Sequence, residues 1–133
     1  MMQFAKEPTT IVAKYLDAFY SGDFKTAGGL LDPEFDFKGP FVAVKGRDAF
    51  LESAQGLRAT SRGYRLRKQW QDGAECCPVY DLALQGPEKT GTVTMAEWHV
   101  VRNGKIQSAI VLFDSAAFRN ILTSSGGTEA PPM

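Results

Sequence analysis

The chain of 133 residues carries a formal net charge of zero, and 23% of its residues are charged. This length predicts one domain with a real core. The balanced charge excludes the strongly basic footprint of a nucleic-acid-binding protein. No apolar run reaches the length of a membrane span, and the opening MMQFAKEPTT lacks the apolar core of a secretion signal. We therefore expect a cytoplasmic domain with neither a nucleic-acid nor a membrane partner.

The densest basic stretch, RATSRGYRLRK, contains Arg58, Arg62, Arg65, Arg67 and Lys68. At strand spacing, Arg65 and Arg67 share one face, and alternation alone produces this pattern. It therefore predicts a solvated face in preference to a phosphate site.

The two cysteines, Cys76 and Cys77, are adjacent. Successive strand side chains point to opposite faces, so a disulfide between them would be strained. We expect two reduced thiols in a cytoplasmic protein. His99 is the only histidine, and one imidazole with one vicinal cysteine pair does not make a tetrahedral zinc site. The sequence thus predicts no zinc site.

In chain order, helices come first. Residues 8–23, PTTIVAKYLDAFYSGD, predict a helix that begins near Pro8 and ends at Gly22, which suits the left-handed position after a helix. A second helix is predicted over 23–31, with Asp23 as N-cap and with Gly28 and Gly29 weakening it. A third is predicted over 46–57. The apolar stripe of the first helix consists of Ile11, Tyr15, Leu16 and Phe19.

Strands dominate the rest of the chain. A short strand is predicted over 33–41, where Phe35 and Phe37 alternate with charges. Four more follow at 63–73, 74–86, 90–101 and 105–115, then a short helix at 116–122. Pro78 inside the second of these four predicts an edge strand or a bulge. Residues 1–8 are expected to be flexible and 123–133 to be a disordered tail. This order predicts an α+β domain with helices on one face of a curved antiparallel sheet.

The Asn103-Gly104 pair predicts a two-residue hairpin in which Arg102 lies opposite Lys105. Extending that register pairs His99 with Ser108, Glu97 with Ile110, Met95 with Leu112 and Val93 with Asp114. One face then carries four polar residues, Glu97, His99, Ser108 and Asp114. The other is nearly all apolar and carries Ala96, Trp98, Val100, Ala109, Val111 and Phe113. We expect the first face to line a cavity under the helices and the second to pack on a partner subunit as a homodimer.

Five segments, YLDAFYSGDF, LLDPEFDFKGPF, KGRDAFLE, VYDLAL and AEWHVVRNGKIQSAIVLFD, together resemble the SnoaL-like branch of the nuclear transport factor 2-like superfamily. That branch is similar in fold to ketosteroid isomerases. The resemblance implies a single domain over 9–122, with a cone-shaped, curved antiparallel or mixed sheet wrapped by three N-terminal helices in a cystatin-like arrangement. The fold hosts isomerases, cyclases, dehydratases, hydrolases and non-enzymes, so it does not by itself define the chemistry.

The similarity to ketosteroid isomerases can be followed residue by residue. Tyr15, in YLDAFYSGD, matches the oxyanion-hole tyrosine. His99, in HVVRNGKI, falls where that family has an acidic partner in the hole. Gly39 stands where the catalytic aspartate precedes a proline. The chain therefore keeps the tyrosine, exchanges the acid for an imidazole and lacks the base, which is unlike a steroid isomerase of that type.

The resemblance implies acid–base catalysis in an apolar pocket without metal or cofactor. An imidazole titrates near neutrality, so His99 can act as acid or base. Glu97 would lie about 7 Å from it along the strand and could orient it. Asp81 could reach the same cavity from a neighbouring strand. The predicted catalytic residues are His99, Tyr15, Glu97 and Asp81. The predicted ligand-binding residues are Trp70, Phe37, Phe50, Met95, Ser108, Leu112 and Asp114.

Structural interpretations of the same residues stay open. Tyr15 could be a core tyrosine with a satisfied hydroxyl. Glu97 could hold an arginine from a helix, such as Arg58. Asp114 could cap the closing helix. Trp70 and Trp98 could belong to the core or to an interface.

Three functions are compatible with the sequence. The first is a small cofactor-independent isomerase, cyclase or dehydratase acting on an apolar carbonyl compound, with Tyr15 or His99 stabilising an enolate oxygen. The second is a non-catalytic module that binds an apolar small molecule, which Gly39 favours. The third is an interaction protein that uses the apolar outer sheet face for dimerisation or for another partner.

Overall fold

The structure is a computed structural model and describes residues 7–124. The ends predicted to be flexible or disordered therefore lie almost entirely outside the described residues. Across residues 7–124, none of the helices combines the length and apolarity needed to cross a membrane. The elements are α1 (Pro8–Ser21), α2 (Phe24–Gly29), β1 (Leu31–Lys38), β2 (Ala43–Lys45), α3 (Arg47–Ser53), α4 (Gln55–Thr60), β3 (Ser61–Asp72), β4 (Glu75–Gln85), β5 (Thr90–Arg102), β6 (Lys105–Phe113) and α5 (Ser115–Leu122).

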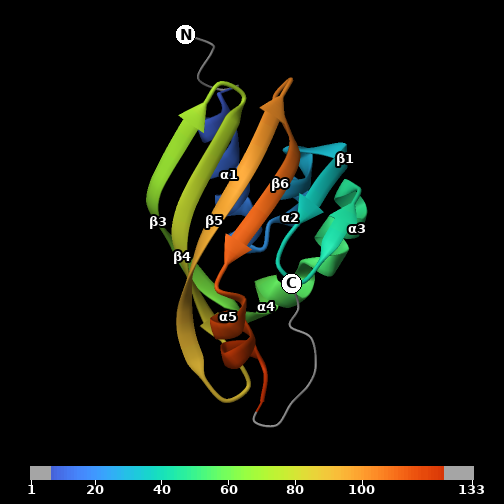
Figure 1. Ribbon diagram of the computed structural model, residues 1–133. Coiled ribbons are helices and arrows are strands. Elements are labelled where there is room, and N and C mark those ends of the chain that lie inside the picture. The colour runs from blue at the N-terminus through green and yellow to red at the C-terminus, as the bar shows by residue number, and fades with distance from the viewer. Residues whose placement is uncertain (1–6, 125–133) are drawn as a thin grey trace.

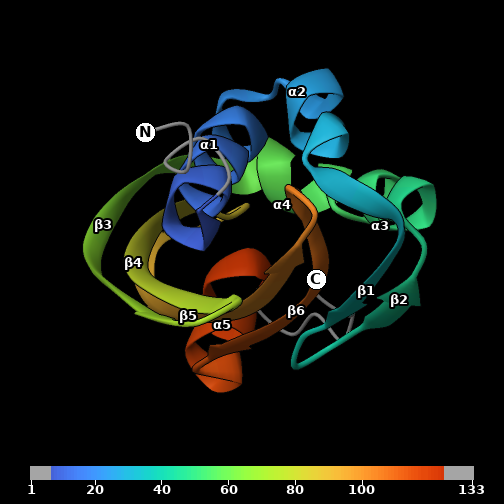
Figure 2. The same ribbon diagram turned by 90° about the horizontal axis from the view of Figure 1, so that it is seen from above.

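The six strands form one sheet in the order β2-β1-β6-β5-β4-β3 (Figure 1). Strand β1 runs parallel to β6, and every other neighbouring pair is antiparallel. Seen from above, the sheet curls into a trough, and α1 lies across its concave side (Figure 2). The predicted α+β cone with a curved mixed sheet is confirmed.

Local signals in the sequence account for the helix boundaries. Gly22 ends α1 with φ +86°, a conformation that a side chain would strain. Asp23 caps α2 by accepting the backbone N–H of Thr26. The predicted third helix is in fact two short helices, α3 and α4, which meet at Ala54. The three-residue strand β2 was not predicted, because it is too short to show a period.

The core lies between the concave side of the sheet and the helices. Strands β4 and β5 bury alternate residues, as a half-covered strand requires. The concave positions include Tyr80, Leu82 and Met95, all buried. Helix α5 closes one end of the sheet, and a Cβ built on Gly86 would lie 1.7 Å from the carbonyl oxygen of Ile121. Glycine therefore permits a contact that no other residue allows there.

The β5–β6 hairpin corrects the predicted register. Asn103 and Gly104 both have positive φ, at 54° and 74°, and Arg102 lies opposite Lys105 as predicted. The register then shifts by one between Val100 and Val101, so that His99 lies opposite Ala109 and not opposite Ser108. A one-residue shift exchanges the two faces of a strand. The predicted faces are therefore right for β5 and wrong for β6, whose Ala109 and Val111 point inward while Ser108, Ile110 and Leu112 point outward.

Strand β4 corrects a second prediction. It pairs with β3 on one side and with β5 on the other, so Pro78 does not mark an edge strand. The irregularity lies instead in β3, between Leu66 and Lys68, opposite Tyr80 and Val79. A bulge close to the proline therefore accompanies it, but on the partner strand.

Candidate functional site

His99 and Glu97 lie side by side on the concave face of β5, and the structure brings them together as predicted. His99 is 0% exposed and Glu97 is 5% exposed. The Nε2 atom of His99 lies 2.9 Å from Oε1 of Glu97. Buried polar groups in an apolar interior are costly unless they are paired. This contact is therefore the centre of the buried polar network.

Two tyrosines that the sequence reasoning did not identify complete the network. The hydroxyl of Tyr80 donates to Oε2 of Glu97. Its oxygen also lies 2.7 Å from the hydroxyl oxygen of Tyr20 on α1. Alternation along β4 does place Tyr80 on the buried face with Leu82. That it meets Glu97 depends on the register between β4 and β5, which a single sequence does not reveal.

A second tyrosine–carboxylate pair carries polar contacts toward the surface. The ring of Tyr64 lies 5.3 Å from that of Tyr20 and 5.4 Å from that of Tyr80. Its hydroxyl donates to Oδ1 of Asp17 on the exposed side of α1. The tyrosines thus form a layer between α1 and the sheet, with one carboxylate in the interior and one at the rim.

Burial and the charge of Glu97 keep the tyrosine hydroxyls protonated. Desolvation raises the pKa of Tyr15 and of Tyr80 well above the usual value, and the nearby Glu97 raises both pKa values further. The pKa of Tyr20 is raised by the same two causes, in the same order. At neutral pH these hydroxyls are therefore hydrogen-bond donors.

The second ring nitrogen of His99, Nδ1, does not take part in the contact with Glu97. Nδ1 is buried and has no hydrogen-bond partner among the described residues. If Nε2–H donates to the Glu97 carboxylate, Nδ1 carries the lone pair and can accept a proton. The ring of Tyr15 approaches the imidazole edge-on, with centroids 5.8 Å apart and an interplanar angle of 68°. The predicted neighbours Tyr15, Glu97 and His99 thus share one region of the interior.

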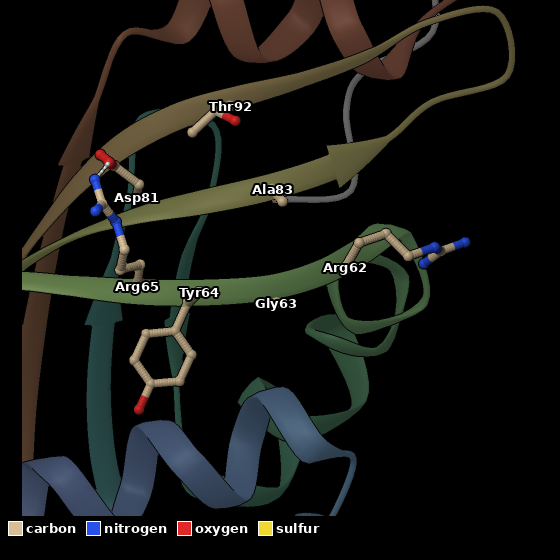
Figure 3. A pocket seen from close by; sticks show the side chains of 7 residues that line it. All are labelled: Arg62, Gly63, Tyr64, Arg65, Asp81, Ala83 and Thr92. Carbon is tan, nitrogen blue, oxygen red and sulfur yellow. Dashed lines mark hydrogen bonds and ion pairs between the residues drawn. The ribbon is translucent and has the colours of Figure 1, made fainter.

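Asp81, the fourth predicted catalytic residue, lies elsewhere. It points from β4 to the outer side of the sheet, where Arg67 contacts it at 3.1 Å and Thr94 donates to it at 2.8 Å. The hydrogen bond from Thr94, followed by that from Arg67, lowers the pKa of Asp81. Figure 3 shows Asp81 and Arg65 on one side of the sheet and Tyr64 pointing the other way, toward α1. The expectation that Asp81 reaches the interior is therefore wrong, because its side chain has the opposite parity to Tyr80.

The structural alternatives for two other residues are also decided. The interpretation that Glu97 holds Arg58 is wrong, because its oxygens bond to His99 and Tyr80. Asp114 caps α5 by accepting the backbone N–H of Ala117, which confirms the capping interpretation.

The predicted ligand-binding residues divide between the two sides of the sheet. Phe37, Phe50 and Met95 are buried in the core. Trp70 is 52% exposed and Leu112 is 58% exposed on the outer side, and Ser108 is half-buried there. The register shift explains why Ser108 and Leu112 point away from His99.

The surface formed by the described residues is hollowed at several places, three of which are described next. A groove of about 430 Å³ is lined by the residues of Figure 3, Arg65 and Asp81 among them. A second, of about 330 Å³, lies beside Arg58. A third, of about 280 Å³, lies between Trp70 and Trp98. His99 and Glu97 line none of the three. Within residues 7–124, no three His, Cys, Asp or Glu side chains are placed to hold a metal ion.

A curved mixed sheet with helices on its concave side and a buried polar cluster inside defines a cone-shaped small domain of the nuclear transport factor 2-like class. Comparison with family models matches the SnoaL-like domain over residues 12–109. This chain therefore belongs to the SnoaL-like family. No protein of curated function matches its sequence.

Solved structures share the fold at low sequence identity. An NTF2-like protein of unknown function from Burkholderia pseudomallei is similar with a TM-score of 0.78 and 15% identity, covering 88% of this chain and 98% of that one. A provisionally assigned isomerase from Rhodopseudomonas palustris has a TM-score of 0.69 and 17% identity, with 78% and 89% covered. TerC, co-crystallised with polyporic acid, has a TM-score of 0.77 and 16% identity, with 88% and 98% covered.

Proposed function

We propose that this protein is a cofactor-independent acid–base enzyme, an isomerase, cyclase or dehydratase, that acts on a small apolar carbonyl compound inside the cone. The observation that carries the proposal is His99, which is fully buried, bonded to Glu97 through Nε2, and unpartnered at Nδ1 within residues 7–124. Leaving a buried polar atom without a partner costs about 1–3 kcal/mol. Functional sites retain such a cost because a bound ligand relieves it.

The contacts support distinct roles for the neighbouring groups. Glu97 holds the imidazole by Nε2, and Tyr80 holds Glu97 in turn. Nδ1 would remove a proton from the carbon next to the substrate carbonyl, and the protonated ring would return it at another carbon. A protonated hydroxyl at Tyr15 suits hydrogen bonding to the developing enolate oxygen. His99 is fully buried and lines none of the three pockets described above, so the proposal includes the opening of a path between α1 and the sheet when a ligand binds.

Comparison with known folds supports a small-molecule ligand. TerC was co-crystallised with polyporic acid, and another similar structure is provisionally assigned as an isomerase. Both share the fold of this chain at less than 20% identity, and therefore neither identifies its substrate. They support only a small-molecule ligand and isomerase-type chemistry.

A non-catalytic binding module is the second candidate, and Gly39 favours it. Ketosteroid isomerases carry their aspartate base at this position, and here a Cβ would lie 3.3 Å from the ring of Phe37. The position therefore offers neither a base nor ready room for one. In this candidate, the same interior holds an apolar molecule and releases it unchanged.

Homodimerisation through the outer sheet face is part of the proposal. Trp98 is 47% exposed, and Leu112 and Trp70 lie on the same side of the sheet. Exposed apolar side chains gathered on one face are typical of a surface that another chain covers. Light scattering at micromolar concentration tests this, and Trp98→Lys is expected to shift a dimer to monomer. A wild-type monomer under these conditions would contradict the proposed interface.

The free thiols Cys76 and Cys77 support a reducing location, and we place the protein in the cytoplasm. Fractionation of the producing cells tests this placement directly, and recovery outside the cytoplasm would refute it.

The test of catalysis is proton exchange next to a carbonyl. Cyclic ketones and enones are incubated with the protein in D₂O, and deuterium incorporation is followed by NMR. We expect exchange above the buffer rate, a loss of at least about tenfold in His99→Gln and Tyr15→Phe, and no loss in the exposed control Glu34→Gln. Changes in the protein's NMR chemical shifts on addition of a compound, without deuterium exchange into that compound, would favour the non-catalytic binding module. Equal exchange by wild type and His99→Gln would refute the assigned role.

A further inference from the structure

Arg58 is a cation without an ion-pair partner among residues 7–124, and it lies where α4 meets the end of α1. It lies in the last turn of α4. Its guanidinium packs so closely on Gly22 that a Cβ there would lie 3.1 Å from one terminal nitrogen and 3.2 Å from Nε. Nε is buried and has no hydrogen-bond partner in residues 7–124, and none of the ion pairs among these residues involves Arg58. The residue as a whole is half-buried, and a guanidinium that is partly withdrawn from water is stabilised by pairing with an anion.

The guanidinium forms part of the wall of a pocket of about 330 Å³. Gly22, Phe24, Gln55 and Ala59 form the rest of the wall. That volume lies at the small end of the range for ligand sites, which usually combine apolar walls with a few convergent polar groups. This pocket has that composition, with one cation, one amide and one aromatic ring.

Phe24 supplies the apolar wall of this pocket, and core side chains hold its ring in place. Its ring stacks on Phe19, with centroids 5.2 Å apart and an interplanar angle of 27°. Phe19 is buried, and its own ring also stacks on Phe50. A ring held in this way gives a ligand a pre-organised surface, so little conformational entropy is lost on binding.

We propose that this pocket binds the carboxylate of a small planar molecule, an aryl carboxylate. The guanidinium of Arg58 holds the two carboxylate oxygens with paired N–H groups. The ligand ring lies against Phe24, and the amide of Gln55 offers a further hydrogen bond. The site does not include His99 or Glu97, so it stands independently of the catalytic proposal.

A structural role for Arg58 makes a different prediction. Its cation lies close to Gly22, at the C-terminal end of α1, where the helix dipole favours positive charge. In that interpretation, removing the charge lowers the melting temperature but no carboxylate binds. Ligand binding and stability must therefore be measured on the same variants.

The test is an NMR titration of ¹⁵N-labelled protein with sodium benzoate at constant ionic strength, using benzamide as the uncharged control and acetate as the ring-free control. We expect saturable shifts at the Arg58 Nε–H and the Gly22 amide, with a dissociation constant on the order of millimolar, as for other fragments of this size. Benzamide and acetate are each expected to bind at least tenfold more weakly. Binding of acetate or benzamide as tight as that of benzoate would overturn the proposal.

Variants locate the site. Arg58→Gln is expected to weaken benzoate at least tenfold, and Arg58→Lys to weaken it less, since charge remains but the paired donors are lost. Arg65→Gln changes net charge equally on the outer side of the sheet and should bind as wild type does. Equal binding by wild type and Arg58→Gln would refute the site, as would unshifted Arg58 and Gly22 signals in the wild type at saturation. If Arg58→Gln fails to fold, Arg58→Lys and the wild-type shifts decide.

Discussion

The hydrogen bond between Tyr80 and Glu97 is expected to be the most stabilising polar contact in the interior. The hydroxyl of Tyr80 donates to a carboxylate that is 5% exposed, and Tyr80 itself is fully buried. A hydrogen bond to a charged group contributes about 1.5–3 kcal/mol. In a double-mutant cycle of Tyr80→Phe and Glu97→Met, we expect a coupling energy of about 2 kcal/mol. That energy corresponds to about 1 M in the urea midpoint.

The pair of Tyr64 and Asp17 at the rim of the sheet, here called the rim pair, provides a matched control, because the Tyr64 hydroxyl also donates to a carboxylate, but an exposed one. Water competes for both groups there, so the cycle of Tyr64→Phe and Asp17→Ala should give a coupling energy below about 1 kcal/mol. Urea unfolding of the seven proteins, the shared wild type and three variants in each cycle, measures both values when each is fitted as a two-state transition. A coupling energy for Tyr80 and Glu97 no larger than that of the rim pair would refute the reasoning that burial strengthens this bond.

Three further predictions concern buried groups and close packing. The pKa of Tyr80 is raised in the folded protein, so its contribution to stability is fully present below the unfolded pKa of about 10 and is lost as pH rises above it. At pH 11, the free energy of unfolding measured with urea should be lower by about 1 kcal/mol from this residue. An undiminished free energy of unfolding would contradict this. Burial raises the pKa of Cys76 to about 12, so a disulfide reagent at neutral pH should label it only on unfolding, and rapid labelling would count against the buried thiol. Gly86→Ala should lower stability by about 2 kcal/mol or more through its clash with Ile121. Gly29→Ala meets nothing within 4 Å and should leave stability unchanged or raise it by up to about 1 kcal/mol, because alanine favours a helix more than glycine does. Equal melting temperatures for the two variants would refute the clash.

Local signals predicted most of the fold. Gly22 ends α1, Asp23 caps α2 and Asn103-Gly104 turns the last hairpin, because each depends only on the conformation or hydrogen bonding of a few neighbouring residues. Alternation in β4 and β5 separates buried from exposed positions for the same reason. His99 and Glu97 were therefore recognisable as interior neighbours on one strand.

Contacts between distant segments could not be predicted in this way. Tyr80 meets Glu97 and Tyr20 because β4, β5 and α1 pack at particular offsets, and a single sequence does not encode those offsets locally. Asp81 was expected in the interior for its chemistry, whereas its place on the strand puts it with Arg67 and Thr94 outside. The alternation with Tyr80 was the available signal for both residues.

The register shift in the β5–β6 hairpin links the interior site to the outer face. Between the Val101–Ile106 and Val100–Ser108 pairs, β6 contains the extra residue Gln107, whose side-chain amide donates to the carbonyl of Arg102 at 3.2 Å. If Gln107 instead paired with Val100 in a regular ladder, the hydroxyl of Ser108 would lie opposite His99 and could satisfy Nδ1. Because Gln107 is left unpaired, the residue opposite His99 is Ala109, which has no polar side-chain atom to offer.

The same shift turns Ile110 and Leu112 outward beside Trp98, where they enlarge the apolar outer face. This one-residue register shift therefore favours both an unpartnered buried imidazole nitrogen and a surface suited to a second chain. The ladder hydrogen bonds lost at a bulged residue must be replaced by other hydrogen bonds. In this hairpin, the side chain of Gln107 provides part of that compensation.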